Sequence, residues 1–409
     1  AIAHLNLSTL YSKPYSHGRD NLGVVLRNST DASETKRAKV GEVYDAIESD
    51  LLEAIRLMGN STRRGNAGYA SKETAQALLS RVYLYMEKNR EVIDLVNDML
   101  GGAAPSTKLE STADFPSYFA NALERKETLW AVAHTALESR ATSSLASMYL
   151  TDGSGWGEMY SSDPLNDLFA KNPNDVRFSY IKPQEVPGAT DYMIWWPVKS
   201  AADDFYENEI RNGVTFDNDA GKYKFEDNGS TVYVEEELID GHTQYYIMLN
   251  GKKNVRLAPR MYDRGGWPKY FVTKFSYQNG DPMLSSPVML RWAEVILNRA
   301  EAYSKENMES EALADVNVLR QRAGLSGDQL FTSDNKKGYT NALDIVLDER
   351  RLELAFEGHR AHDIYRNKKS MDRRYAGAHP WEVIDYTDNK IQYYIPLDEI
   401  TVSNIIQNP

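Results

Sequence analysis

Apolar residues recur at three- and four-residue steps in the C-terminal part of the chain. Residues 292–303 and 313–323 each place one apolar stripe along a helix face, and Gly324 follows as a C-terminal stop. A third helix is predicted over 341–356, with Gly358 as its exit. Only a few residues separate the first two helices, so they are predicted to fold back on each other as an antiparallel hairpin.

Helical spacing also marks the first hundred residues. The opening stretch 1–11 reads as the end of a helix, and residues 40–58 form an amphipathic helix. Ser71 is predicted to cap a helix that runs to about Met86. One more helix follows over 91–100, before a Gly-Gly pair ends the region.

The two helical regions resemble each other. The sequence LLSRVYLY at 78–85 lines up with ILNRAEAY at 296–303, and a charged turn containing Asn follows each of them. Paired amphipathic helices of this kind are the unit of a tetratricopeptide-type array. We therefore predict that 38–101 and 285–357 form helical hairpins of one continuous array.

The helical period is largely lost between residues 106 and 284. The sequence ETLWAVAH at 127–134 alternates like a short strand. Four runs rich in β-branched and aromatic residues follow within 213–257, separated by Asp-Asn, Asn-Gly, Asp-Gly and Asn-Gly pairs. Such pairs are typical of tight hairpin turns, so a series of β-hairpins is predicted here.

Composition narrows the classes of function. The 409 residues carry a formal net charge of −12, which argues against a nucleic-acid partner, because such partners require a basic face. There is no cysteine, so thiol chemistry and thiolate metal sites are excluded. No apolar run approaches the ~20 residues that span a bilayer. The 26 Tyr and 7 Trp are the one excess that points to a ligand, because carbohydrate sites use aromatic faces.

Several motifs, taken together, resemble the SusD/RagB family. They are RWAEVILNRAEAY, ALADVNVLRQRAG and LDERRLELAFEGHRAHDIYR, with YYIPLDEITVSNIIQNP at the chain end and AIAHLNLSTLYSKPYS at the start. Ser12 stands where the family commonly has Gly, and Val176 stands where a family turn has Pro. The matches cover both helical regions and occur in the family's order, whereas the middle matches loosely.

The resemblance implies a mainly α fold: a tetratricopeptide-like helical-hairpin array with an irregular, partly β half that faces the ligand. Residues 1–409 would form one SusD-like domain. Its helical scaffold would comprise 1–105 and 285–370, its variable ligand-facing region 106–284, and its C-terminal tail, packed on the scaffold, 371–409.

The resemblance also implies a function. The protein would be a lipid-anchored, surface-exposed protein of the outer membrane that binds glycans and delivers them to a SusC-like TonB-dependent transporter. Ala1 stands inside an amphipathic pattern without an N-cap, so we expect the chain to lack its N-terminus. In this family that part carries a signal peptide, the lipid-bearing cysteine and further helix. No cofactor and no enzymatic activity are implied.

Aromatic residues of the middle segment are the candidate ligand-binding residues. A flat indole can stack on the apolar face of a pyranose while neighbouring polar groups bond its hydroxyls. The middle segment contains four candidate tryptophans in stretches rich in Gly, Pro or Asp, and they are predicted to lie in loops. The candidates are Trp156, Tyr160, Trp195, Trp196, Trp267 and Tyr270. The alternative for each is that it fills the core beneath a loop.

The densest charged cluster is predicted to be structural. Its members are Glu349, Arg350, Arg351, Glu353, Glu357, His359, Arg360, His362 and Asp363. A glycosidase needs two carboxylates about 5–10 Å apart on opposite sides of a bond. The three glutamates instead recur every fourth residue on one helix face, which favours ion pairs with arginines. The two histidines lack the spacing of a helical zinc pair, so no catalytic or metal-binding residue is assigned.

Three other functions stay open. Some members of the family are associated with peptides rather than sugars. A helical glycan-degrading enzyme would need two convergent acids, and the sequence offers no obvious pair. A pure tetratricopeptide scaffold for protein partners would leave the aromatic middle segment unexplained.

Overall fold

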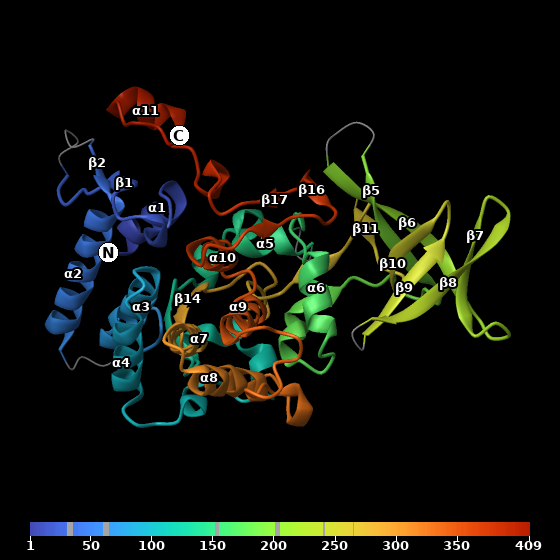
Figure 1. The fold of residues 1–409 in the computed structure, drawn as a ribbon, viewed down its shortest axis with the longest axis horizontal. Helices are drawn as coiled ribbons and strands as arrows, with labels where there is room; N and C mark the ends of the chain where they lie inside the picture. Colours follow the sequence, from blue (N-terminus) through green and yellow to red (C-terminus); the bar gives the residue numbers. More distant parts are fainter. Residues whose placement is uncertain (31–35, 60–64, 152–154, 201–204, 240–241, 265) are drawn as a thin grey trace.

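The computed structural model describes residues 1–30, 36–59, 65–151, 155–200, 205–239, 242–264 and 266–409. Figure 1 shows a helical body and, beside it, a sheet that closes on itself. The body is built from the two ends of the chain, and the closed sheet from its middle. Helix α6 (Asp163–Ala170) lies between them.

The long helices of the body share one hydrophobic core. They are α1 (Ile2–Tyr11), α2 (Val40–Met58), α3 (Lys72–Tyr85), α4 (Asn89–Leu100), α7 (Trp292–Lys305), α8 (Glu309–Arg322) and α9 (Ala342–Glu353), followed by the shorter α10 (Arg360–Arg366). Two further short helices are α5 (Leu145–Tyr149) and α11 (Leu397–Ser403). Ile47, Leu79 and Ile296 belong to the shared core. Two regions far apart in the sequence therefore pack as one unit.

The hairpins α3–α4 and α7–α8 turn in the same way. Lys88 N donates to Tyr83 O in the first turn, and Met308 N donates to Tyr303 O in the second, both at 2.9 Å. Helices α3 and α7 contain 14 residues each. Tyr83 therefore corresponds to Tyr303, and the predicted pairing of Tyr85 with Tyr303 is wrong by two residues. Tyr83 and Tyr85 are two residues apart, so the sequence match paired the wrong tyrosine with Tyr303.

The closed sheet is antiparallel and contains seven strands in the order β16-β6-β5-β10-β9-β8-β7. They are β5 (Tyr192–Lys199), β6 (Phe205–Asp217), β7 (Lys222–Asp227), β8 (Ser230–Ile239), β9 (His242–Met248), β10 (Lys252–Pro259) and β16 (Gly377–Pro380). The far end of β6 also pairs with β7, from Thr215 opposite Lys224 to Asp217 opposite Lys222. Strands β5 to β10 therefore form a ring, and β16 lies outside it (Figure 1).

Two predicted Asn-Gly turns are confirmed in the ring. Asn228 and Gly229 join β7 to β8 with φ of 50° and 80°, and Asn250 and Gly251 join β9 to β10 with φ of 52° and 105°. Two successive positive φ angles match the right-handed twist of the paired strands, and Asn-Gly tolerates them best. The predicted Asp240–Gly241 turn lies outside the described residues.

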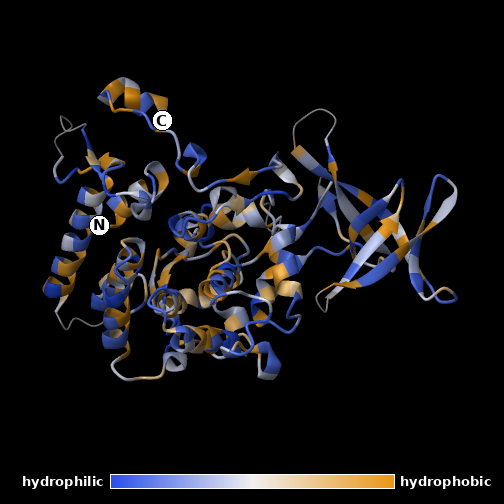
Figure 2. Cartoon of the chain, viewed as in Figure 1, coloured by the Kyte–Doolittle hydropathy of each residue, from blue (hydrophilic) through white to orange (hydrophobic). Residues whose placement is uncertain are grey.

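The ring has its own hydrophobic interior. Its buried members are Ile194, Trp196, Val214, Phe225, Val234, Ile247 and Val255. Every second side chain of a strand points inward, and Figure 2 shows the resulting alternation of hydrophobic and hydrophilic residues along these strands. Strand β5 is the exception, because its other face packs Trp195 with Met193 and Met261.

Short strand pairs join the remaining segments. They are β1 (Leu22–Val25) with β2 (Arg37–Lys39), β3 (Thr128–Ala131) with β14 (Val288–Arg291), β4 (Ile181–Pro183) with β13 (Tyr270–Val272), β11 (Asp263–Arg264) with β12 (Trp267–Pro268), and β15 (Met371–Asp372) with β17 (Val383–Ile384). The predicted strand within ETLWAVAH is β3. Its partner β14 leads directly into α7, which attaches the middle segment to the helical body.

The C-terminal tail contacts more than the scaffold. Strand β16 pairs with β6, with Gly377 opposite Tyr206, and the rings of Tyr206 and Trp381 lie 3.9 Å apart between centroids. At the chain end, Asn408 Nδ2 donates to Tyr11 O at 2.9 Å. The tail thus runs from the closed sheet to α1 (Figure 1). No helix within the described ranges is long and apolar enough to cross a bilayer.

Candidate functional site

A groove of about 550 Å³ lies where α6 faces the closed sheet. One wall is α6, and the other is formed by residues of β5, β8, β9, β10 and β13. Its polar lining includes Asp163, Asn166, Asp167, Gln244, Asn254 and Arg256. This size falls in the range of small-molecule sites, and convergent polar groups in such a cleft fix the orientation of a ligand.

Arg256 of β10 crosses the groove to α6. Its Nη2 donates to Asp167 Oδ2 at 2.5 Å, and its Nη1 lies 3.4 Å from Asp163 Oδ2. Burial raises the pKa of Asp163, and Arg256 opposes part of that rise. Two buried donors in the walls, Arg256 Nε and Asn166 Nδ2, have no hydrogen-bond partner within the described part of the chain. Buried donors are normally bonded, so these two are exceptions in the walls of the groove.

Two of the six predicted ligand-binding residues, Trp195 and Tyr270, line this groove. Trp195 is only 2 % exposed, so it supports the floor instead of offering a ring face. Tyr270 is partly buried, and burial raises the pKa of its hydroxyl group. Tyr245 of β9, which the sequence did not single out, is also partly buried and lines the groove. The tyrosines therefore supply the accessible aromatic surface.

The prediction that the middle tryptophans lie in loops is wrong for Trp195, Trp196 and Trp267. Trp267 lies in the short strand β12. Trp195 and Trp196 lie in β5, and each is 2 % exposed. Trp196 points into the ring, where the guanidinium of Arg211 lies 5.4 Å from its ring centroid. A ligand cannot stack on a side chain enclosed in this way, so Trp196 belongs to the interior of the closed sheet.

The remaining three candidates lie away from the groove. Trp156 is 57 % exposed, and its Nε1 donates to Thr142 O at 3.0 Å. Tyr160 packs against the cluster that contains Phe271. Trp267 is partly buried in the short strand β12. None of the three is among the groove-lining residues that the structure describes, so the six candidates do not form one platform.

Sequence reasoning missed the polar wall that α6 contributes. The helix has only eight residues, which is too short for a clear periodic pattern. A signal was nevertheless present. Asp163 and Pro164 suit a first helical turn, and Leu165, Leu168 and Phe169 recur at helical spacing and are buried. The polar residues between them face the groove.

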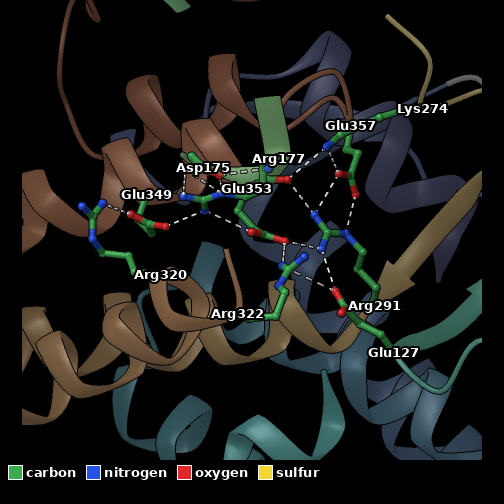
Figure 3. Close-up of polar contacts among 10 residues, drawn as sticks. All are labelled: Glu127, Asp175, Arg177, Lys274, Arg291, Arg320, Arg322, Glu349, Glu353 and Glu357. Carbon is green, nitrogen blue, oxygen red and sulfur yellow. Dashed lines mark hydrogen bonds and ion pairs between the residues drawn. The ribbon is translucent and has the colours of Figure 1, made fainter. Parts of the chain in front are cut away.

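The glutamates of α9 lie in a buried ion network (Figure 3). Glu349 accepts hydrogen bonds from Arg177 at 2.5 Å and from Arg320 at 3.0 Å. Glu353 accepts from Arg291 at 2.6 Å and from Arg177 at 3.1 Å. Each of these side chains is at most 3 % exposed. The network joins α9 to α8, to the start of α7 and to the middle segment.

Glu357, just past α9, completes this network. It accepts hydrogen bonds from Arg291 Nε and Lys274 Nζ, both at 2.8 Å. Burial raises the pKa of Glu357, but the two cations outweigh burial and lower the pKa to about 2. The pKa of Glu353 is likewise well below its usual value, because arginines outweigh burial. A general acid must hold a proton near neutral pH. The predicted ion pairs between these three glutamates and arginines are therefore present, and a structural role for the whole charged cluster stays a prediction.

Comparison with known proteins points to one family. Residues 126–404 match the model of the SusD family, and residues 1–84 match a model described as starch-binding associating with outer membrane. SusD-like protein P2 of Formosa agariphila is 32% identical over 136 residues, which cover 32% of this chain and 26% of the relative. SusD-like protein P38 of the same organism is 28% identical over 110 residues, covering 25% and 21%. The matched stretches thus span about a quarter of these curated relatives.

Solved structures share the fold. A SusD superfamily protein from Bacteroides thetaiotaomicron has a TM-score of 0.67 and 24% identity, covering 100% of this chain and 75% of its own. A SusD-like carbohydrate binding protein from Bacteroides vulgatus has a TM-score of 0.63 and 18% identity, covering 98% and 73%. Surface glycan-binding protein A from Bacteroides uniformis has a TM-score of 0.61 and 14% identity, covering 100% and 75%. Because the SusD family model matches more than half of this chain, the chain belongs to the SusD family.

Proposed function

We propose that this protein binds oligosaccharides at the bacterial cell surface, in the groove between α6 and the closed sheet. Two proteins of the same fold are described as a SusD-like carbohydrate binding protein and a surface glycan-binding protein. The observation that carries the proposal is the groove itself. It combines tyrosine surface with several amide groups, two carboxylates and an arginine, which is the chemistry that a sugar ring and its hydroxyls require.

The second part of the proposal is delivery. Bound oligosaccharide would pass to a SusC-like TonB-dependent transporter in the outer membrane, and a lipid anchor would hold the protein there. The outer-membrane association named by the family model at residues 1–84 supports this location. The division of the chain supports separate roles, with the helical body offering a surface to the transporter and the closed sheet with α6 holding the ligand.

The acids of the groove favour binding over hydrolysis. Asp163 and Asp167 both lie on α6, and one arginine, Arg256, contacts both. A glycosidase needs carboxylates on opposite sides of the scissile bond. Two acids that project from the same helix toward the same cation do not provide this arrangement.

An affinity screen tests the proposal. The purified chain is titrated with a panel of neutral and charged polysaccharides and with a peptide mixture, and reducing ends are measured in parallel. We expect one class of glycan to bind with an affinity between about millimolar and micromolar, or about −4 to −8 kcal/mol. Binding of peptides alone would favour the peptide-binding alternative. Release of reducing sugar from the bound glycan would identify an enzyme and overturn the proposal.

A further inference from the structure

A second cavity, of about 690 Å³, borders the other side of α6. Helix α6 and the residue before it contribute Ser162, Pro164 and Leu165 to this cavity, whereas Asp163 and Asn166 line the groove. Its remaining walls are the end of α9, helix α10 and the tail around β15. The cavity is therefore separate from the groove but shares one helix with it.

Positive groups dominate this second cavity. Its charged lining residues are Arg350, Arg351, Arg360, Arg374 and a single carboxylate, Asp372. That carboxylate is already engaged by Arg374, whose Nε lies 3.0 Å from Asp372 Oδ1. Arg351 has no ion-pair partner among the residues that the structure describes. Such an excess of cations is unexpected in a chain with a net charge of −12.

The arginines of the cavity differ in how far carboxylates compensate them. Arg350 is 1 % exposed and its Nε donates to Asp363 Oδ2 at 2.8 Å, whereas its Nη2 has no hydrogen-bond partner in the described ranges. Arg360 lies 3.7 Å from its nearest carboxylate, Asp348. Burial lowers the pKa of Arg360, and the neighbouring charge of Arg351 lowers it further. Like charges held together in a partly buried site repel each other, and a bound anion removes that repulsion.

We propose that this cavity binds an anionic group of the ligand, a carboxylate or a sulfate ester carried by a sugar. Arginine suits both groups, because its planar guanidinium donates two parallel hydrogen bonds to them. The proposal rests on the glycan binding proposed above and narrows its ligand to acidic saccharides. The tyrosines Tyr149 and Tyr375 at the cavity wall offer the ring surface for the sugar that carries the charge.

Matched pairs of oligosaccharides test this proposal by calorimetry. Oligogalacturonate is compared with its fully methyl-esterified form, and a sulfated oligosaccharide with its desulfated form. We expect at least one charged form to bind about tenfold or more tightly than its neutral counterpart, because hydrogen bonds to a charged group are stronger than those to a neutral one. Preference for galacturonate identifies the carboxylate, and preference for the sulfated form identifies the sulfate ester. Equal affinity within both pairs contradicts the proposal.

Variants then locate the charge effect. Arg351→Gln should weaken binding of the preferred charged form about tenfold and leave the neutral form unchanged. Arg374→Gln gives a second test. The Arg374 side chain is 55 % exposed, so its replacement should leave the protein folded. The matched control is Arg90→Gln on α4, where the side chain is 63 % exposed and also paired with a carboxylate. If the control weakens binding as much as both cavity variants do, the effect is a general charge effect and the site is wrong.

The two proposals can fail separately. If neutral glycans bind and the charge makes no difference, the cavity proposal is wrong while glycan binding stands. The opposite outcome is that no oligosaccharide binds, neutral or charged, while galacturonate monosaccharide or inorganic sulfate does bind. If Arg351→Gln abolishes that binding, an anion site is present and the groove proposal is wrong.

Discussion

Arg177 of the middle segment donates a hydrogen bond of 2.5 Å to Glu349 of α9, although 172 residues separate them in the chain. Both side chains are at most 2 % exposed. Asp175 holds the other side of the same guanidinium, with Nη2 2.6 Å from its Oδ2. A buried cation is tolerated only when carboxylates surround it. A buried ion network therefore joins the middle segment to the helical scaffold.

Glu353→Gln should destabilise the protein strongly. Glu353 faces Arg177, Arg291 and Arg322, and removing its charge leaves buried guanidinium groups uncompensated. Breaking such an arrangement costs about 3–5 kcal/mol, measurable by urea unfolding. The control is Glu309→Gln, which removes a partly exposed pair with Lys336 and should cost about 1 kcal/mol or less. Similar small losses for both variants would show that the network contributes little.

Stability should fall with acid in two separate pH ranges. Burial lowers the pKa of His359 from its usual 6.5 to about 4 in the folded state. Between these two pH values, the folded state therefore binds fewer protons than the unfolded state. The free energy of unfolding therefore decreases as pH falls from about 6.5 to about 4. The pKa of the Glu357 carboxyl is about 2, against a usual 4.5. The charged carboxylate therefore stabilises the folded state, and this contribution is fully present above pH 4.5. That stability is lost as pH falls through about 2.

The variant His359→Gln separates these two ranges. The free energy of unfolding is measured by urea at pH 7.5, 5.5, 4.5 and 3. The loss between pH 7.5 and 4.5 should be smaller in the variant than in the wild type, while the loss below pH 4.5 should remain. Burial also lowers the pKa of His362, so part of the first loss persists. Identical profiles above pH 4.5 would exclude a buried, uncharged His359.

Two tryptophans from the same middle segment should respond differently to truncation. Trp196→Ala empties a position inside the closed sheet and should cost about 3–5 kcal/mol. Trp156→Ala, at a side chain that is 57 % exposed, should cost about 1 kcal/mol or less. Thermal unfolding of the two variants decides this. A role for Trp156 in ligand binding stays a prediction, tested by glycan affinity in the same variant. Equal destabilisation by both changes would contradict the placement of Trp196.

The helices could be predicted because local chemistry specifies them. The range predicted from the pattern for the second helix, 40–58, matches α2 (Val40–Met58). Ser71 caps α3 by accepting a hydrogen bond from Thr74 N, as the sequence suggested. Asn341 caps α9 in the same way, by accepting from Asp344 N. Caps and a 3.6-residue period are readable within a dozen residues, so these elements required no tertiary information.

The ligand-facing region could be predicted only in part, because its decisive features are not local. Strand β5 reads YMIWWPVK and is buried on both faces along Met193 to Trp196, so it lacks the alternation that marks a half-buried strand. The pairing of β6 with β7 closes the sheet and so decides which face of β5 is enclosed. The sequence of one segment cannot show such a pairing, so it could not tell whether Trp195 or Trp196 faces a ligand. The groove combines α6 with β5, β8, β9, β10 and β13, which are spread along the chain, so its polar residues could not be grouped from spacing.

The affinity of Tyr245→Ala for the oligosaccharide found in the screen, compared with that of Tyr233→Ala, tests directly whether the groove binds glycan. Tyr245 lines the groove, whereas Tyr233 lies on β8 of the same closed sheet, is 36 % exposed and is not a lining residue. An aromatic stack contributes about 1 kcal/mol beyond burial, so Tyr245→Ala should weaken binding about fivefold or more. Because Tyr245 also packs against the interior of the closed sheet, affinity is measured well below the melting temperature of the variant. Tyr233→Ala should bind like the wild type. Wild-type affinity in a folded Tyr245→Ala protein, or equal losses in both variants, would show that the groove is not the glycan site.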